Sequence, residues 1–115
     1  MTRLNIRSKV WLEIDGKPFL GGGRLRLLRA IAATGSINAA AQQLGISYRK
    51  AWSQLQEMEK HGILLVEREK GGCGGGQSTV TAQAHELLRK FDALQNGLNQ
   101  IVDDRFAAIF APEER

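Results

Sequence analysis

The stretch that decides the fold is Ser36–Lys60, SINAAAQQLGISYRKAWSQLQEMEK. It predicts two short helices joined by a tight turn, because Ser36 and Ser47 each stand where a side-chain oxygen can accept a hydrogen bond from the free amides of the following helix. Between them, Leu44–Ile46 supplies two apolar residues at the corner and a central glycine, which tolerates positive φ. This pattern is typical of a helix-turn-helix.

The second helix of the pair has an apolar and a polar face. Ala51, Leu55 and Met58 fall at positions i, i+4 and i+7, the spacing of a buried stripe. Trp52 is expected to pack against the first helix or against the segment that follows. The opposite face carries groups suited to nucleic acid, and a solvated polar face without a ligand is the alternative; its residues are Tyr48, Arg49, Lys50, Ser53 and Gln54.

These side chains differ in what they can recognise. Arginine suits bidentate contact with guanine and glutamine suits adenine, so Arg49 is the leading candidate for reading bases. Lys50 and Ser47 are expected at phosphates, the latter together with the free amides of its helix terminus. Ser36, which caps the preceding helix, completes the predicted DNA-binding set in this stretch.

Charge is distributed unevenly along the 115 residues. The formal net charge is +4, and residues 16–56 hold six basic side chains and no Asp or Glu. From residue 71 onward, four basic residues face six acidic ones. The positive field therefore lies over the predicted helix-turn-helix, which favours double-stranded DNA as the partner.

Several classes of protein are excluded by what the sequence lacks. A single cysteine precludes an internal disulfide and suits a reducing cytoplasm. No apolar run approaches the roughly twenty residues that span a bilayer, and no signal peptide precedes the domain. His61 and His85 have no second ligand at metal spacing, and no catalytic triad or carboxylate pair indicates an enzyme. We expect a cytoplasmic, non-catalytic protein without a metal.

The segments before the helix-turn-helix predict a strand and a supporting helix. Residues 4–14 alternate between apolar and polar side chains, which is typical of a half-buried strand, and Asp15-Gly16 marks its end. Residues 18–23 read as a connector. A helix is expected over residues 24–34, with a glycine C-cap at Gly35 and an inward face made of Leu25, Leu28, Ile31 and Ala32.

The segments after it predict a wing and a long helix. Strands over residues 64–69 and 78–81 flank the glycine-rich run Gly71–Gly76, and Arg68 with Lys70 is expected to reach a DNA phosphate from this wing. Thr81 is expected to cap a helix over about residues 82–110. Its apolar residues keep heptad spacing, which indicates pairing with a second copy; the expected dimer interface comprises Leu87, Phe91, Leu94, Leu98 and Ile101.

The chain resembles the N-terminal domain of ModE-type molybdate-dependent transcriptional regulators, a LysR-like winged helix. The resemblance is carried by Thr34–Ile37, Leu44–Trp52, Leu65–Arg68 and the glycine run Gly71–Gly76. It implies DNA binding as a dimer. Full-length relatives sense molybdate through C-terminal domains that this chain lacks, so we expect no cofactor in it and allow for a separate effector-sensing protein. Ala84 stands where the family usually has glycine.

We therefore expect a mainly α fold with a small antiparallel sheet, a single winged helix-turn-helix domain over residues 1–115 with a long C-terminal dimerisation helix. The expected function is sequence-specific regulation of molybdate transport or molybdenum-related genes, by repression or activation, through a palindromic operator. A small oxyanion-binding module and a protein–protein adaptor are the alternatives. The glycine-rich segments motivate the first alternative, and the basic, acid-free stretch argues against the second.

Overall fold

A computed structural model describes residues 3–69 and 77–111; the predicted phosphate contact of Lys70 and the predicted glycine-rich tip of the wing lie outside them. The described chain forms two compact units, Trp11–Leu88 and Met1–Val10 with Arg89–Arg115. It is mainly helical, as expected, with two small antiparallel sheets in place of one. The prediction of a single domain stays a prediction.

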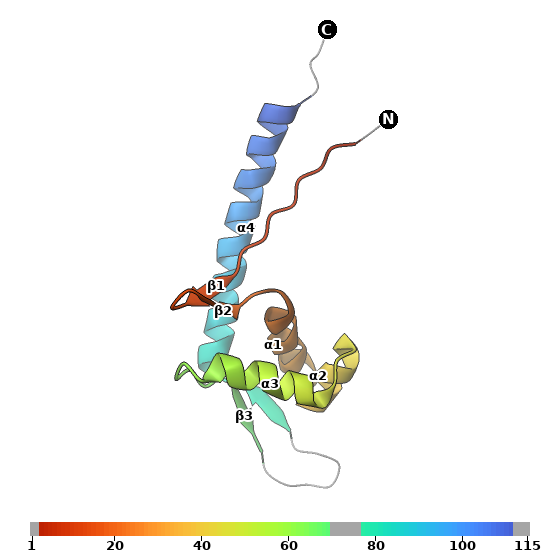
Figure 1. The fold of residues 1–115 in the computed structure, drawn as a ribbon, viewed down its shortest axis with the longest axis vertical. Coiled ribbons are helices and arrows are strands. Elements are labelled where there is room, and N and C mark those ends of the chain that lie inside the picture. The colour runs from red at the N-terminus through yellow and green to blue at the C-terminus, as the bar shows by residue number, and fades with distance from the viewer. Residues whose placement is uncertain (1–2, 70–76, 112–115) are drawn as a thin grey trace. The chain divides into compact units, whose positions relative to one another are not determined.

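In chain order the elements are β1 (Leu12–Ile14), β2 (Lys17–Leu20), α1 (Gly22–Thr34), α2 (Ile37–Leu44), α3 (Tyr48–Glu59), β3 (Val66–Arg68), β4 (Ser78–Val80) and α4 (Ala82–Phe110) (Figure 1).

The helix-turn-helix forms through the local signals that predict it. The Ser36 Oγ accepts from the Ala39 amide at 3.1 Å and caps α2, and the Ser47 Oγ accepts from the Lys50 amide at 3.0 Å and caps α3. Gly45 ends α2 in the left-handed conformation, with φ of 70°. Both serine caps and the glycine corner are confirmed.

The supporting helix α1 differs from the prediction in its start and in its inward face. It begins at Gly22 and ends at the predicted Gly35 C-cap, which has φ of 73°. Leu27 and Ala30 are buried, whereas Ala32 is exposed and Leu25 only half-buried. The inward stripe is turned by about one residue because α1 packs against both α2 and α3, and sequence spacing alone does not fix that rotation.

The core of the unit Trp11–Leu88 lies between α1, α2, α3 and the wing. Ala51, Leu55 and Met58 are fully buried, which confirms the predicted stripe of α3. Small side chains at Ala40 and Ala41 are also buried, so α2 can approach its neighbours closely. The remaining buried apolar side chains of this unit are Phe19, Leu20, Leu27, Leu28, Ala30, Ile31, Ile37, Leu65, Val66, Val80, Ala84 and Leu88.

The wing is a two-stranded hairpin, shorter than predicted. β3 covers Val66–Arg68 and pairs antiparallel with β4, with Val66 opposite Val80 and Arg68 opposite Ser78. The Ser78 amide bonds the Gly35 carbonyl at 2.8 Å, which ties the wing to the end of α1. The predicted cap of α4 is confirmed, since the Thr81 Oγ1 accepts from the Ala84 amide at 3.0 Å.

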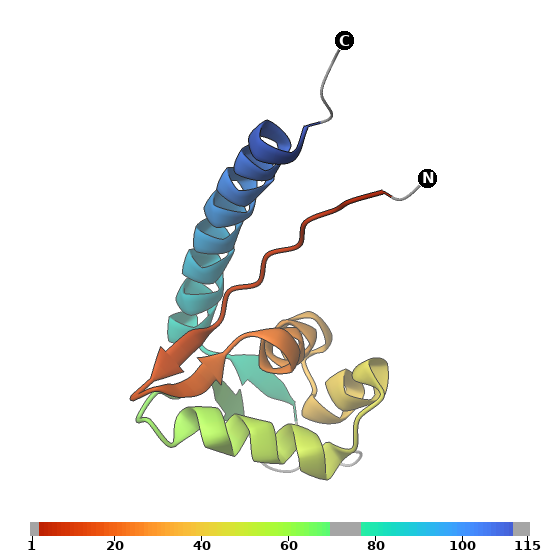
Figure 2. The same cartoon turned by 45° about the horizontal axis from the view of Figure 1, so that its top comes forward.

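The predicted strand over residues 4–14 is largely wrong. Only Leu12–Ile14 forms a strand, and its partner is β2, a segment that we expected to be a connector. Because Leu20 already pairs with Leu12, β2 has no residue left to extend the ladder toward the N-terminus. Pro18 in β2 lies opposite Glu13, next to the point where the register of the two strands shifts. An irregular position suits proline, because it has no amide hydrogen to donate to a regular ladder. In Figure 2 the hairpin lies beside the C-terminal half of α3, and Phe19 packs edge-on against His61.

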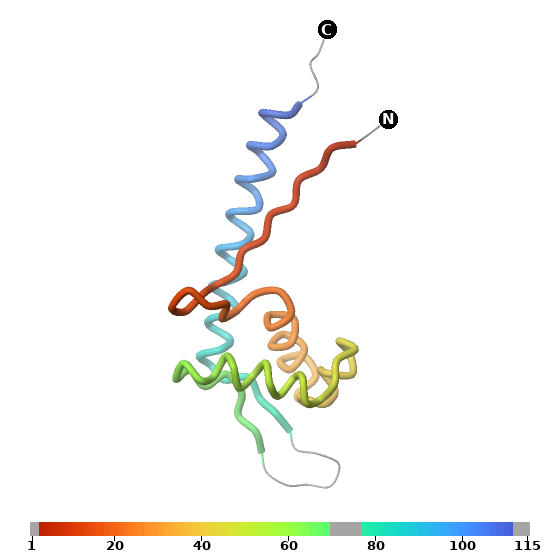
Figure 3. Tube along the Cα trace, in the orientation of Figure 1, coloured from red at the N-terminus to blue at the C-terminus, as the bar shows by residue number. Residues whose placement is uncertain are grey.

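The second unit consists of an extended arm and the later part of α4. The trace of the arm runs beside this part of the helix (Figure 3). The Ser8 Oγ donates to the Asn99 Oδ1 at 2.7 Å, so the one polar residue on the apolar side of the arm has a partner on α4. Leu4 and Ile6 remain exposed. The helix itself ends at Phe110, as predicted.

Two glycine-to-alanine substitutions are expected to change stability in opposite directions. Gly45→Ala places a Cβ on left-handed backbone and should lower the free energy of unfolding by about 1 kcal/mol. Gly97→Ala lies inside α4 with open space around its Cβ and should raise it by about 0.5 kcal/mol. Urea unfolding at a fixed protein concentration measures both, and an unchanged or higher stability of Gly45→Ala contradicts the assigned turn.

Candidate nucleic-acid interface

The outer face of α3 presents a polar ridge. Arg49 and Ser53 are exposed on it, as predicted. Gln56, at position i+7 from Arg49, is also exposed and continues the ridge, although we did not include it among the predicted residues. The helical spacing of residues 49, 53 and 56 is the signal that identifies it. An exposed arginine, hydroxyl and amide on one helix face can all donate hydrogen bonds to an approaching surface.

Gln54 is not part of this exposed face. It is half-buried, and its Oε1 is buried without a hydrogen-bond partner among the described residues. The prediction that Gln54 faces outward is therefore wrong. It precedes the buried Leu55 by one position and follows the exposed Ser53, so its position at the border of the polar face cannot be judged from periodicity alone.

At the N-terminal ends of α2 and α3, the first backbone amides have no acceptor within the helix. Ser36 is half-buried and Ser47 exposed, and each side chain satisfies one amide of the helix that it caps. Tyr48 and Lys50 are exposed in the first turn of α3. A helix N-terminus combined with an adjacent ammonium group favours an anion. These four predicted residues therefore lie where a phosphate contact is feasible.

The carboxylate of Glu59 joins the end of α3 to the first strand of the wing. Its Oε2 accepts from the Leu65 amide at 2.9 Å and from the Val66 amide at 3.1 Å. Its Oε1 accepts from the Arg68 guanidinium at 3.3 Å. Leu65 and Val66 are both buried, so without this carboxylate their amides would lack an acceptor. We did not identify Glu59 from the sequence, because its partners lie six to nine residues away.

The guanidinium of Arg68 is turned onto α3. Its Cζ lies 4.1 Å from the centroid of the Trp52 ring, and 28% of the side chain is exposed. Trp52 was expected to pack against the first helix or against the wing, and this contact places its ring against the wing residue Arg68. Arg68 was expected to reach a DNA phosphate, and that contact stays a prediction; in the structure an ion pair and an aromatic face hold the side chain at the base of the wing.

Other cations near the ridge are also engaged. The Arg24 guanidinium donates to the Pro18 carbonyl at 2.7 Å. At the far end of α3, the Lys60 ammonium donates to the Glu57 carboxylate at 2.8 Å. This hydrogen bond lowers the pKa of Glu57, which stays ionised at neutral pH. The positive charge of the ridge is therefore concentrated at its N-terminal end, around Arg49 and Lys50.

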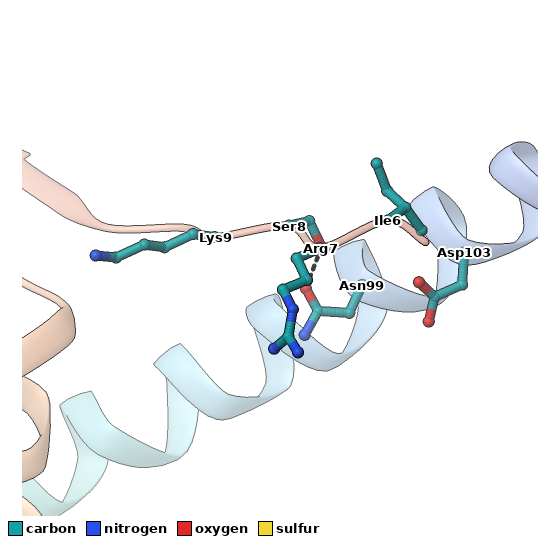
Figure 4. Close-up of a pocket in the computed structure, with 6 residues that line it drawn as sticks. All are labelled: Ile6, Arg7, Ser8, Lys9, Asn99 and Asp103. Carbon is teal, nitrogen blue, oxygen red and sulfur yellow. Dashed lines mark hydrogen bonds between the residues drawn. The ribbon is translucent and has the colours of Figure 1, made fainter. Parts of the chain in front are cut away.

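The second unit contains an open hollow of about 530 Å³ between the arm and α4. Figure 4 shows its lining, including Arg7 and Lys9 from the arm and Asn99 from the helix. The carboxylate of Asp103 lines the same hollow and would repel an anion. Two cationic side chains and one carboxylate therefore line this hollow.

The sequence of residues 23–85 matches the family model described as bacterial regulatory helix-turn-helix protein, lysR family. The chain belongs to this family. The matched region begins in α1 and ends in the first turn of α4, so it contains the helix-turn-helix, the wing and the contacts of Glu59 and Arg68.

Two curated relatives of this lysR-family chain carry names connected with molybdenum or regulation. The molybdenum-pterin-binding protein MopA of Rhodobacter capsulatus is 36% identical over 104 residues, which are 90% of this chain and 39% of MopA. The DNA-binding transcriptional dual regulator ModE of Escherichia coli (strain K12) is 37% identical over 98 residues, which are 81% of this chain and 37% of ModE. The chain thus spans less than two fifths of the length of either relative.

A solved structure with the same fold contains DNA. The crystal structure of the CbnR_DBD–DNA complex superimposes with a TM-score of 0.56 at 28% sequence identity, and the match covers 74% of this chain and 93% of that chain. This similarity confirms the predicted winged helix-turn-helix fold.

Neither a cluster of metal ligands nor a membrane-spanning helix occurs in the described part of the chain. Over residues 3–69 and 77–111, no three His, Cys, Asp or Glu side chains gather as metal ligands. None of the helices in these ranges is both long and apolar enough to pass through a lipid bilayer.

Replacing Glu59 should destabilise the protein strongly. Glu59→Ala leaves two buried amides without an acceptor and Arg68 without its counter-ion, which we expect to cost about 2 to 4 kcal/mol of unfolding free energy. Glu57→Ala is the matched control, because Glu57 is exposed and pairs only with exposed Lys60; its stability should be nearly unchanged. Chemical denaturation of both variants measures the difference, and equal stabilities contradict the role given to Glu59.

Proposed function

We propose that this chain is the DNA-binding part of a homodimeric transcriptional regulator that reads a palindromic operator. The observation that carries the proposal is the exposed N-terminal half of α3, where Arg49, Lys50 and Ser53 project from a capped helix in an acid-free part of the chain. Membership of the lysR family supports it, as does the fold shared with a protein solved in complex with DNA.

The side chains of the interface divide into two roles. Arg49 and Ser53, with Gln56 beside them, read base edges in the major groove, because the early residues of a recognition helix enter that groove. Lys50 neutralises a phosphate, and the capped helix ends at Ser36 and Ser47 add backbone amides. Tyr48 donates its phenolic hydroxyl to the DNA backbone. Lys70 stays a predicted phosphate contact of the wing.

The regulated genes belong to molybdate transport or molybdenum use. The names of two relatives support this assignment, one being a molybdenum-pterin-binding protein and the other a transcriptional dual regulator. The regulator acts in the cytoplasm, where bacterial DNA lies, and it is not an enzyme. Operator binding by this chain requires no cofactor, and the effector is sensed by another segment or by a separate protein.

Dimerisation occurs through the later part of α4. Leu94, Leu98 and Ile101 form an exposed apolar stripe at i, i+4 and i+7, and a second copy covers it. The predicted residue Phe91 is buried within the chain and Leu87 is half-buried, so neither contributes much exposed surface. Two recognition helices of such a dimer would bind half-sites about 34 to 36 Å apart or a multiple of this distance.

Two substitutions on α3 separate base reading from phosphate contact. Arg49→Ala should relax specificity at one or two base positions, since arginine recognises guanine through two hydrogen bonds. Lys50→Ala should weaken binding to all sequences alike and reduce the slope of log affinity against log salt by about 1.8, which is about 0.9 for each copy in the dimer. Fluorescence anisotropy measures both effects on a duplex selected from a random library by the wild-type chain and on its single-base variants.

The same titrations test the proposal itself. Binding of the wild-type chain should weaken steeply as salt rises, because released counter-ions drive it. No binding at low salt, or binding that is independent of salt, overturns DNA recognition. Identical behaviour of Arg49→Ala and Lys50→Ala leaves DNA binding intact and contradicts only the division of roles.

A charge placed on the apolar stripe should dissociate the dimer. Leu98→Glu loses about 2 kcal/mol of burial from each copy, so the dimer dissociation constant should rise at least about a hundredfold. Asn96→Glu adds the same charge on the opposite side of α4 and should leave association unchanged. Sedimentation equilibrium measures both constants, and a dimer that persists in Leu98→Glu contradicts this interface.

A further inference from the structure

Two successive contacts link the wing to the start of the recognition helix. The Arg68 guanidinium lies over the face of Trp52, with Cζ 4.1 Å from the ring centroid. Trp52 in turn packs edge-on against Tyr48, with centroids 6.3 Å apart and an interplanar angle of 61°. Tyr48 is the first residue of α3, and 48% of it is exposed. A cation on the wing is thereby connected to an aromatic ring on the candidate DNA face.

The other end of this chain of contacts is fixed by Glu59. Its carboxylate pairs with Arg68 at 3.3 Å while it also accepts two buried backbone amides of the turn before β3. The carboxylate is therefore held by the fold, and Arg68 is held by the carboxylate. The Arg68 Nε is buried without a hydrogen-bond partner among the described residues, so the ion pair and the Trp52 face keep this orientation although one donor is left unmet.

An arginine in this position has little freedom to neutralise DNA. To reach a phosphate, its guanidinium would have to leave both the Trp52 face and the Glu59 carboxylate, which leaves that partly buried carboxylate without its counter-ion. The planar guanidinium also suits stacking in a way that a lysine ammonium does not. Both observations indicate that the Arg68 side chain orients the residues around it.

We propose that Arg68 is a positioning residue, which sets the orientation of Tyr48 through Trp52, and that it is not a phosphate contact. The inference rests on the proposed DNA binding by α3. It makes the wing base a determinant of specificity, because the Tyr48 contact with the DNA backbone fixes the register of α3 on the operator. Binding to other sequences has no fixed register and does not depend on that contact.

Three groups of variants in the full chain test this inference. Arg68→Lys keeps the charge and removes the planar stack, and Arg68→Gln removes both. Arg49→Lys makes the same substitution on the exposed ridge and is the control for the emission measurement below, whereas in the DNA titrations it is expected to lose specificity because Arg49 itself reads bases. Tyr48→Ala, alone and combined with Arg68→Lys, reports whether the two residues act through one another. Anisotropy titrations over a range of salt use the duplex selected by the wild-type chain and a scrambled duplex of equal length.

The expected result is a loss of specificity without a change in salt dependence. Arg68→Lys should weaken binding to the selected duplex about tenfold, leave the scrambled duplex unchanged and keep the wild-type salt slope. In the Tyr48→Ala background the same substitution should have almost no further effect. If Arg68 contacts a phosphate, Arg68→Lys will resemble the wild type, and Arg68→Gln will weaken both duplexes and reduce the slope by about 1.8, about 0.9 for each copy in the dimer. That result overturns the inference.

A measurement without DNA tests the contact on its own. In a Trp11→Phe background Trp52 is the only tryptophan, so its emission reports the stacked guanidinium. Arg68→Lys should shift this emission and Arg49→Lys should not, while circular dichroism checks that both variants are folded. Unchanged emission in Arg68→Lys overturns the inference. If the wild-type chain binds neither duplex, the proposed function itself fails. If the wild-type chain binds and the variants depart from the expected pattern, only the inference about Arg68 fails.

Discussion

The hydrogen bonds accepted by the Glu59 carboxylate hold the recognition helix and the wing together. One oxygen accepts two successive buried amides at the start of the wing, and the other accepts from Arg68. Backbone amides in an apolar interior need acceptors, and the carboxylate supplies one for the amides of Leu65 and Val66, where β3 begins. On its other side, the wing is bonded through the Ser78 amide to the carbonyl of Gly35. The wing base is therefore fixed to α3 at one strand and to α1 at the other.

The elements that could be predicted from sequence depend on contacts within a few residues. Ser36, Ser47 and Thr81 cap helices whose amides lie three positions ahead, and Gly35 and Gly45 end helices through their own backbone geometry. The bounds of α4 were accurate for the same reason. These signals are local, so no knowledge of the tertiary structure is required to interpret them.

The features that were missed depend on partners far along the chain or absent from it. Residues 4–11 alternate as a strand does, but alternation requires only one apolar and one polar side, and an arm beside a helix satisfies that requirement as well. Arg68 was expected to extend from the wing because sequence shows the sign of a charge and not its neighbours. Gln54 lies between the exposed Ser53 and the buried Leu55, and helical spacing alone does not specify how much of its side chain is covered.

The count of positive charges overstates the charge available to a polyanion. Arg68 is held between a carboxylate and an aromatic ring, and Arg24 donates to backbone carbonyls before α1. Both still contribute to the long-range field, because an ion pair or a hydrogen bond does not remove a cation from the total charge. Direct contact with a polyanion requires exposed cations, and at the start of α3 these are Arg49 and Lys50.

The stack of Arg68 on Trp52 has an evolutionary consequence. The guanidinium requires both an aromatic face at position 52 and a carboxylate at position 59, so the three positions should covary among related chains. A lineage that replaced the ring with an aliphatic side chain would lose the reason to keep arginine at position 68, and selection on the carboxylate would then come only from the two amides that it accepts. Coordinated substitution at these positions would also mark lineages in which the tyrosine at position 48 has acquired a different partner.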